Sequence, residues 1–184
     1  MYPDRITVLR GDITEKDSLK AAFCEHFSIV INCAASVKHF ANYESLMSVN
    51  LHGVENLAEL CIENAVRLIH VSTVSVGGDM LKSSVHEAVL KENTLELGQD
   101  VESNMYVYSK YLAERHIIDR IKNDGLKAKI MRVGNLMGRN KDGEFQMNFK
   151  TNNFVNTLRA YSVLGCFPLE GNRKRIPLQI YRWS

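Results

Sequence analysis

The sequence lacks both a strong charge imbalance and a long apolar run. These two absences argue against nucleic acid and membranes as binding partners of the protein. Its formal net charge is +2 over 184 residues, with acidic and basic side chains interspersed, so no surface for nucleic acid or an anionic membrane is indicated. No uninterrupted apolar stretch approaches the roughly 20 residues that cross a bilayer. The residues that follow Met1 do not resemble a signal peptide. We therefore expect neither a nucleic-acid nor a membrane partner, and a cytoplasmic location.

Metal-binding patterns are also missing. The four cysteines lie far apart with no Cys-x-x-Cys spacing, and the six histidines show no spacing typical of metal ligands. We predict no metal site, and we expect buried free thiols, as in a reducing compartment, at all four cysteines: Cys24, Cys33, Cys61 and Cys166.

What the sequence does contain is an alternation of short aliphatic runs with longer amphipathic segments. The composition, 45% hydrophobic and 24% charged, is that of one soluble globular core. The alternation predicts right-handed βαβ units, and hence a Rossmann-like α/β fold with a parallel sheet and helices on both faces. The expected strands cover residues 5–9, 28–32, 67–72 and 128–133, and the expected helices cover 14–27, 43–64, 106–124 and 153–163.

Local signals refine two of these segments. Thr14 and Asp17 have capping-box spacing at the start of the first helix. The run Ile-Val-Ile in 28–32 has no polar alternation, which is typical of a strand buried on both faces. Residues 79–104 are mostly polar and long for a connection, so we interpret them as a functional or mobile loop.

Small and polar residues follow the carboxyl end of each expected strand. Parallel α/β sheets bind ligands just beyond these ends, so the residues should gather on one edge, called here the C-terminal rim. They are Gly11-Asp12, residues 32–36, Ser72-Thr73 and Gly134-Asn135.

A possible proton donor opens the expected helix 106–124. Tyr106 and Lys110 stand at i and i+4, so their side chains share one face. A phenol has a pKa of about 10 in isolation, and a neighbouring ammonium would lower that pKa towards neutrality, where general acid catalysis is efficient. Thr73 ends a strand on the same rim and could bind the same carbonyl oxygen, although a hydroxyl that bonds a turn is the simpler interpretation of Thr73 alone.

Several motifs together resemble the extended short-chain dehydrogenase/reductases. They are Gly11-Asp12, Asn32-Cys33-Ala34-Ala35, Asn50 within Val-Asn-Leu-His-Gly, Val71-Ser72-Thr73, and Tyr106 to Lys110. A closer resemblance is to the thioester reductase domains of nonribosomal peptide synthetases and carboxylic acid reductases. It rests on Val-Ser-Thr-Val-Ser-Val at 71–76, Arg-Val-Gly-Asn-Leu-Met-Gly-Arg at 132–139 and Asp-Gly-Glu-Phe-Gln-Met-Asn-Phe at 142–149.

This resemblance implies a catalytic triad of Thr73, Tyr106 and Lys110. The implied reaction is hydride transfer from NADPH to the thioester of an acyl or peptidyl chain on a carrier protein, giving an aldehyde that can be reduced again to an alcohol. Asn50 would support a proton relay, with a hydrogen bond inside its own helix as an equal alternative. The implied cofactor-binding residues are Asp12 and Ile13, with Asp12 beside the adenine, Ala34 and Ala35 along the cofactor path, Lys110 at the ribose, and Gly134 and Asn135 near the nicotinamide.

The chain departs from this family ahead of Tyr2, and the resemblance fades after Pro168. The strand, Gly-rich turn and helix that hold the cofactor pyrophosphate have no counterpart ahead of Tyr2. We therefore expect a partial NAD(P)-binding reductase domain over residues 1–168, lacking the first βαβ Gly-rich unit, and an unclassified tail over 169–184. Lys38 and His39 would either meet the substrate or simply face solvent.

Two other functions stay open on the sequence. One is another extended family member that acts on a nucleotide sugar, such as an epimerase or dehydratase. Against it, Val76-Gly77 stands where a Tyr-Gly usually follows the strand-end Ser/Thr in those enzymes. The other is a catalytically inactive fragment that only binds or scaffolds, which the missing Gly-rich turn favours.

Overall fold

The computed structural model forms two compact units, residues 1–132 and 133–184. The structure describes residues 5–24, 27–37, 42–81, 89–136, 138–145, 152–165 and 178–179. The expected boundary near residue 168 falls outside these ranges and stays a prediction.

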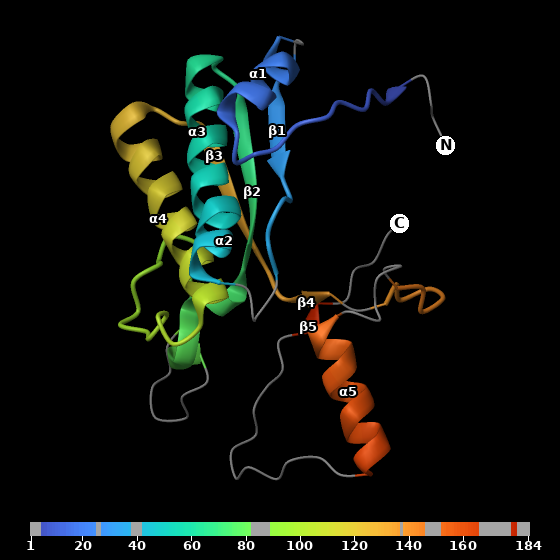
Figure 1. Ribbon diagram of the computed structural model, residues 1–184. Coiled ribbons are helices and arrows are strands. Elements are labelled where there is room, and N and C mark those ends of the chain that lie inside the picture. The colour runs from blue at the N-terminus through green and yellow to red at the C-terminus, as the bar shows by residue number, and fades with distance from the viewer. Residues whose placement is uncertain are drawn as a thin grey trace. The chain divides into compact units, whose positions relative to one another are not determined.

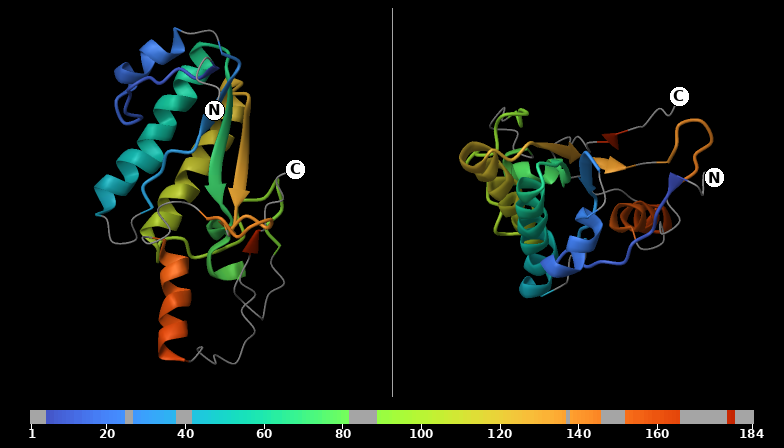
Figure 2. Two further views of the ribbon diagram at one scale, coloured as in Figure 1. Left: turned by 90° about the vertical axis from the view of Figure 1, so that its right-hand side faces the viewer. Right: turned by 90° about the horizontal axis from the view of Figure 1, so that it is seen from above.

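A three-stranded sheet forms the centre of the first unit, in the order β1-β2-β3. Strands β1 and β2 pair in parallel, with Ile29 beside Arg67 and Asn32 beside His70, and the arrows of β2 and β3 run the same way in Figure 2. This sheet confirms the predicted Rossmann-like α/β class and three of the four expected strands. Their bounds are β1 (Ile29–Asn32), β2 (Arg67–Thr73) and β3 (Ala128–Val133).

The helices of this unit follow the predicted positions. The expected helix 43–64 is one uninterrupted helical segment with a π-helical turn in its middle. The expected helix 106–124 starts one residue earlier than predicted. The bounds are α1 (Lys16–Phe23), α2 (Tyr43–Met47), the π-helix η2 (Ser48–His52), α3 (Gly53–Glu63) and α4 (Met105–Asp124). Figures 1 and 2 show α3 and α4 side by side on the same face of the sheet.

The two faces of the sheet differ in burial. Leu68, His70 and Ser72 alternate along β2 and are buried beneath the helices. Ile31 in β1 and Met131 in β3 are 62% and 52% exposed. β1 was expected to be buried on both faces. This expectation is wrong for the described part of the chain, because the helices of this unit pack on one face of the sheet only.

Two expectations near the N-terminus are also wrong. Residues 5–9 form no strand, and their aliphatic side chains are largely exposed. An aliphatic run becomes a strand only where a neighbouring strand takes its backbone hydrogen bonds, and no strand among the described residues pairs with this run. The capping box is not formed either, because Glu15 is the N-cap residue of α1 and makes no side-chain cap. Thr14 instead donates its backbone N–H and its hydroxyl to the carboxylate of Asp12.

Two core clusters hold the unit together. The larger fills the space between the sheet and α3 and α4, and its buried members include Val54, Ala58, Leu68 and Ile117. The second lies where α4 meets the segment that follows the 3-10 helix η3 (Val74–Leu81). Its buried members are Val76, Leu95, Val101, Val107 and Tyr111.

The polar segment before α4 is fixed in its described part, 89–104. The side chain of Gln99 donates to the carbonyls of Val76 and Leu95 at 3.0 and 2.7 Å. The carboxylate of Asp79 accepts the backbone N–H of Asp100 at 2.8 Å. These bonds satisfy backbone groups that a connection without helix or strand leaves unpaired.

The second unit contains the expected helix 153–163 as α5 (Asn153–Leu164), capped by the Asn152 side chain. Strands β4 (Asn135–Leu136) and β5 (Leu178–Gln179) pair in parallel. No helix in the described residues of either unit has the length and apolar character needed to cross a membrane.

The cysteines depart from the expected burial. Cys61 is a buried free thiol, whereas Cys24 and Cys33 are exposed. Cys24 directly follows the short helix α1 and Cys33 directly follows β1. Cys166 lies outside the described residues.

Asn104 gives a test of how α4 is started. Its side chain accepts the Val107 N–H at 3.2 Å, and loss of such a cap costs about 0.5–2 kcal/mol. We expect Asn104→Ala to lower the free energy of unfolding by about 1 kcal/mol in urea titrations. The control is Asn123→Ala, at an exposed site in the last turn of the same helix. Equal stability of the two variants would show that the cap does not hold the start of α4.

Candidate active site

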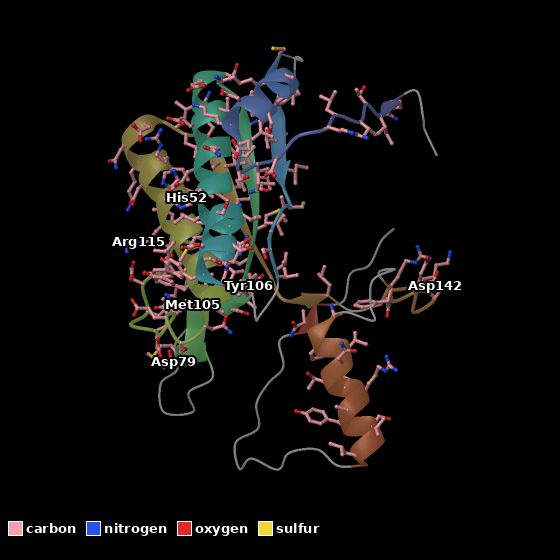
Figure 3. The ribbon with its side chains drawn as sticks, in the orientation of Figure 1. His52, Asp79, Met105, Tyr106, Arg115 and Asp142 are labelled. Carbon is pink, nitrogen blue, oxygen red and sulfur yellow. The ribbon has the colours of Figure 1, made fainter. Side chains whose placement is uncertain are left out.

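The end of β2 and the start of α4 are joined at one place on the C-terminal rim. Figure 3 shows Tyr106 in the first turn of α4. One turn further on, the Nζ of Lys110 donates a hydrogen bond to the carbonyl oxygen of Val71 at 2.8 Å. Val71 lies two residues before Thr73, the last residue of β2. The bond therefore connects the helix that carries two of the predicted triad residues to the strand that ends in the third.

Lys110 is buried, with 2% of its surface exposed. Its Nζ lies 3.1 Å from the Nε2 of His70, which has no exposed surface. Burial lowers the pKa of Lys110 to about 8, and the smaller electrostatic effects of Glu114 and Cys33 oppose this shift. Burial, and then the charge of Lys110, lower the pKa of His70 to about 3. The imidazole is therefore neutral throughout the physiological range.

The predicted effect of Lys110 on Tyr106 is not present in this structure. Burial raises the pKa of the Tyr106 phenol, whereas a nearby ammonium was expected to lower it. The physical reason is that Tyr106 is half-buried, and removal from water disfavours its phenolate. Thr73 shows the simpler role considered for it, because its hydroxyl accepts the Ser75 N–H at 3.1 Å. The catalytic roles of all three residues stay predictions.

The sequence did not predict that Lys110 connects to two polar residues, to His70 directly and to Asn32 through His70. The Nδ2 of Asn32 lies 3.2 Å from the Nδ1 of His70, and the Oδ1 of Asn32 accepts the Ala34 N–H at 3.0 Å. The sequence signal that could have revealed His70 is the two-residue periodicity of the strand, which places His70 on the same face as Leu68 and Ser72. A histidine on the inward face of a buried strand requires polar partners.

Asn50 connects the loop after β1 to α4. It is 1% exposed, accepts the Ser36 N–H at 2.7 Å and donates to the Ser36 carbonyl at 3.0 Å. It also donates to the Ser109 hydroxyl at 2.9 Å. These side-chain bonds run to other elements, so the alternative of a hydrogen bond inside its own helix is wrong. A role in proton relay stays a prediction.

Asp12 and Ile13 form a well-held turn. The Thr14 bonds lower the pKa of the Asp12 carboxyl, so it is an anion at neutral pH. The Ile13 carbonyl accepts from the Asn56 side chain of α3 at 2.9 Å. A Cβ on Gly53 would lie 2.6 Å from the Ile13 side chain, so the glycine allows the turn to approach the helix. An exposed carboxylate in such a turn fits the hydroxyls or amino group of an adenosine moiety.

The remaining predicted residues divide into three groups. Ala34 and Ala35 lie in the loop after β1, where Ala34 is exposed and Ala35 is half-buried. Gly134 and Asn135 belong to the second unit, and their place at the cofactor stays a prediction. Lys38 and His39 lie outside the described residues.

An ion pair missed in the sequence supports the helix that carries the site. Glu114 is fully buried, one turn after Lys110, and its Oε2 accepts from the Nε and Nη2 of Arg132 at 2.9 and 2.8 Å. The Nη1 of Arg132 donates to the carbonyls of Lys91 and Thr94. One guanidinium thus ties β3, α4 and the segment before α4 together. A charge-assisted cluster of this kind is stronger than neutral hydrogen bonds.

Comparison with known proteins gives a family match over almost the whole chain. A family of NAD-binding domains, described as "Male sterility protein", matches residues 1–181. Among solved structures, a thiolation-reductase di-domain from an archaeal non-ribosomal peptide synthetase is 39% identical, with a TM-score of 0.77. The match covers 89% of this chain and 44% of that one.

Two further solved structures are similar to this chain at lower sequence identity. The reductase domain of the aureusimine biosynthetic cluster is 26% identical, with a TM-score of 0.70 over 89% of this chain and 41% of that one. The UDP-glucose 4-epimerase of Thermus thermophilus, in complex with NAD, is 27% identical with a TM-score of 0.57. That match covers 77% of this chain and 45% of the epimerase. The chain thus spans less than half the length of each structure, and the predicted resemblance to extended reductases is confirmed.

His70 predicts how stability depends on pH. Its pKa is about 3 in the folded protein, against an ordinary value of 6.5, so the unfolded chain binds more protons between these values and stability falls as the pH falls. From pH 6.5 to 5, we expect His70→Gln to lose about 1.5 kcal/mol less stability than the wild type, measured by urea titration at each pH.

The control for this experiment is His52→Gln, which removes an exposed histidine and leaves His70 in place. We expect it to keep the steep loss of stability in acid. Equal losses in wild type and His70→Gln would show instead that His70 binds its proton in the folded protein.

Proposed function

The chain belongs to the NAD-binding family described as "Male sterility protein", and from this premise we propose that it reduces a thioester with NADPH. The proposed substrate is an acyl or peptidyl chain bound through sulfur to a carrier protein, and the product is an aldehyde. The observation that carries the proposal is the bond from Lys110 to the Val71 carbonyl. It fixes the start of α4, with Tyr106, against the end of β2, with Thr73.

In the proposed reaction, NADPH supplies the hydride that adds to the thioester carbonyl carbon. Tyr106 donates its phenolic proton to the carbonyl oxygen, and the Thr73 hydroxyl donates a hydrogen bond to the same oxygen, so the negative charge that develops there is stabilised. The resulting hemithioacetal loses the carrier thiol and becomes the aldehyde. Tyr106 then regains a proton, for which the adjacent Lys110 is the nearest route on α4.

The residues present fit part of a dinucleotide. The exposed Asp12 carboxylate suits an adenosine moiety, and the small residues Ala34 and Ala35 leave space beside the loop after β1. Lys110 would reach the ribose next to the nicotinamide. Gly134 and Asn135 are proposed as cofactor-binding residues on the resemblance to thioester reductases alone. NADPH is proposed over NADH on the resemblance to thioester reductases alone.

A carrier-bound substrate is supported by one of the solved structures to which the chain is similar, a thiolation-reductase di-domain of a non-ribosomal peptide synthetase. The aureusimine relative is also a reductase domain, from a biosynthetic cluster. Both match this chain more closely in structure than the epimerase does.

The second candidate function is chemistry on a nucleotide sugar, favoured by the likeness to the Thermus thermophilus UDP-glucose 4-epimerase. Val76 and Gly77 speak against it, because both are buried beneath the segment that precedes α4 and neither offers a polar group to a sugar. The third candidate, a module that binds or scaffolds without catalysis, differs from both in needing no cofactor.

Dinucleotide binding separates the reductase from the scaffold. A ligand at 100 times its Kd adds about 2.7 kcal/mol to stability, which corresponds to a rise in Tm of roughly 5–10 °C for a chain of this size. We expect NADPH to raise the Tm by such an amount and NADH to raise it less. An unchanged Tm with both dinucleotides at millimolar concentration would favour the scaffold.

Substitution of Tyr106 tests the proton donor. We expect Tyr106→Phe to lower turnover of an acyl-pantetheine thioester by about a hundredfold to ten-thousandfold, because a general acid contributes that much. NADPH binding should persist, as measured by the Tm shift. The control is Tyr108→Phe, two residues further on and packed against the second core cluster. Full turnover by Tyr106→Phe, or turnover lost equally in both variants, would contradict the assignment.

A further inference from the structure

The segment before α4, residues 89–104, forms neither a helix nor a strand, so its backbone groups need other partners. The Nη1 of Arg132, in β3, donates to the carbonyls of Lys91 and Thr94, both at 2.9 Å. These two carbonyls bound a turn in which the Thr94 N–H donates to the Lys91 carbonyl at 3.2 Å. Arg132 therefore holds this turn of the segment by a side chain from a regular element.

The same guanidinium is fixed on its other side by a buried carboxylate. The Oε2 of Glu114 accepts from the Nε and Nη2 of Arg132 at 2.9 and 2.8 Å, and the Glu114 side chain has no exposed surface. A guanidinium can serve a carboxylate and two carbonyls at once because its five donors lie on three nitrogens in a fixed plane. A lysine amine carries its three donors on one nitrogen and cannot reproduce this spread.

The segment that Arg132 holds packs on the start of α4. The second core cluster joins Leu95 and Val101 of the segment to Val107 of α4. Tyr106 packs against this cluster and is half-buried. The surroundings of the Tyr106 phenol therefore depend on where residues 89–104 lie. The raised pKa of Tyr106 has burial as its cause, which agrees with this packing.

A second anchor holds the later part of the segment. The Gln99 side chain donates to the carbonyls of Val76 and Leu95, and the Asp79 carboxylate accepts the Asp100 N–H. Residues 89–104 are thus fixed to β3 and α4 at one point and to η3 at another. Loss of the first anchor can loosen the segment beside Tyr106 without unfolding of the chain, because local openings cost less free energy than global unfolding.

We propose that Arg132 is a positioning residue for Tyr106. Through the carbonyls of Lys91 and Thr94 it holds residues 89–104 against the start of α4, and this packing fixes the place and the burial of the phenol. The catalytic consequence, a proton donor held at the substrate carbonyl, rests on the proposed function. The packing itself requires neither cofactor nor substrate, so it is tested on the chain alone.

Arg132→Lys separates the two tasks of the guanidinium. It keeps a cation for Glu114 and gives up the bonds to the two carbonyls. We expect amide hydrogen exchange at the Thr94 N–H to become about tenfold to a hundredfold faster, because a hydrogen bond to a charged group contributes roughly that factor. The rate is compared with that of the Asp100 N–H, which the second anchor holds and which should change less.

The exposure of Tyr106 is the second measurement. A soluble nitroxide relaxes the NMR signals of side chains that solvent reaches, and the Tyr106 ring signal is assigned by its absence from Tyr106→Phe. We expect Arg132→Lys to increase the effect of the nitroxide on the Tyr106 ring at neutral pH. Faster exchange at Thr94 with an unchanged Tyr106 ring would overturn the proposal, because the segment would then not set the surroundings of the phenol.

Glu114→Gln is the matched control. It removes the charge of the same ion pair from the other partner, but it keeps an oxygen for Arg132 and leaves the bonds to Lys91 and Thr94 in place. We expect wild-type exchange at Thr94 and wild-type exposure of Tyr106. If Arg132 contributes to the fold only through its ion pair, the control and Arg132→Lys would instead behave alike.

A double variant covers the case in which Arg132→Lys does not fold. Arg132→Met with Glu114→Leu replaces the buried pair by apolar side chains, a change that is often neutral or stabilising, and it also lacks the two carbonyl bonds. It should show the same faster exchange and the same greater exposure. Wild-type values in whichever variant folds would overturn the proposal, and so would unfolding of both, which would assign Arg132 to the fold as a whole.

These results are independent of the activity. If exchange and exposure change as expected while the chain reduces no thioester, the role of Arg132 stands and the proposed function fails. If the chain reduces thioesters while Tyr106 is equally exposed in Arg132→Lys and in the wild type, the proposed function stands and this inference fails. If both hold, Arg132→Lys should lower kcat while the Tm shift with NADPH persists.

Discussion

The arrangement of the C-terminal rim depends on one interaction, the hydrogen bonding of the lysine amine that is buried between β2 and α4. An amine removed from water must be fully hydrogen-bonded, and its partners must also be satisfied. Here the Val71 carbonyl and His70 supply those partners from one strand, and Asn32 supplies the next from its neighbour. The helix α4 and two strands are therefore held in register by polar groups as well as by the apolar core.

Two more buried side chains extend this network to the loops. Asn50 ties Ser36 to Ser109, the residue just before Lys110. Arg132 ties Glu114, one turn after Lys110, to the segment before α4. The loops that would form a ligand site are thus anchored to the same two turns of one helix. This placement keeps Tyr106 and Lys110 on a rigid element, as precise catalytic geometry requires.

Much of the fold could be predicted from local sequence, because the spacing of apolar residues indicates most of the strands and helices. Three strands and all the long helices follow from aliphatic runs, from Gly125 at the end of α4 and from amphipathic spacing. The run 5–9 misled because strand formation depends on a pairing partner that local sequence does not specify. The solvent exposure of Ile31 was missed for the same reason, since burial of a sheet face depends on which elements cover it.

The meeting of α4 with the end of β2 was predictable, but the electrostatics there were not. Strand ends and the Tyr106–Lys110 spacing predicted that these two elements meet on one rim, and the bond from Lys110 to the Val71 carbonyl lies there. The direction of the pKa shifts could not be read from spacing, because an i, i+4 pair says nothing of burial or of a third partner. His70 is separated from Lys110 by 40 residues, and only the folded strand brings the imidazole to the amine.

The fate of the hydride tests most directly whether this rim reduces a thioester. The chain would be incubated with NADPH carrying deuterium on the transferred position of the nicotinamide and with an acyl-pantetheine thioester, and the products analysed by mass spectrometry. Thioester reduction predicts an aldehyde with one deuterium on its carbonyl carbon, together with one equivalent of free thiol. Free thiol and carboxylic acid without deuterium, or thioester recovered intact with the labelled cofactor bound, would contradict it.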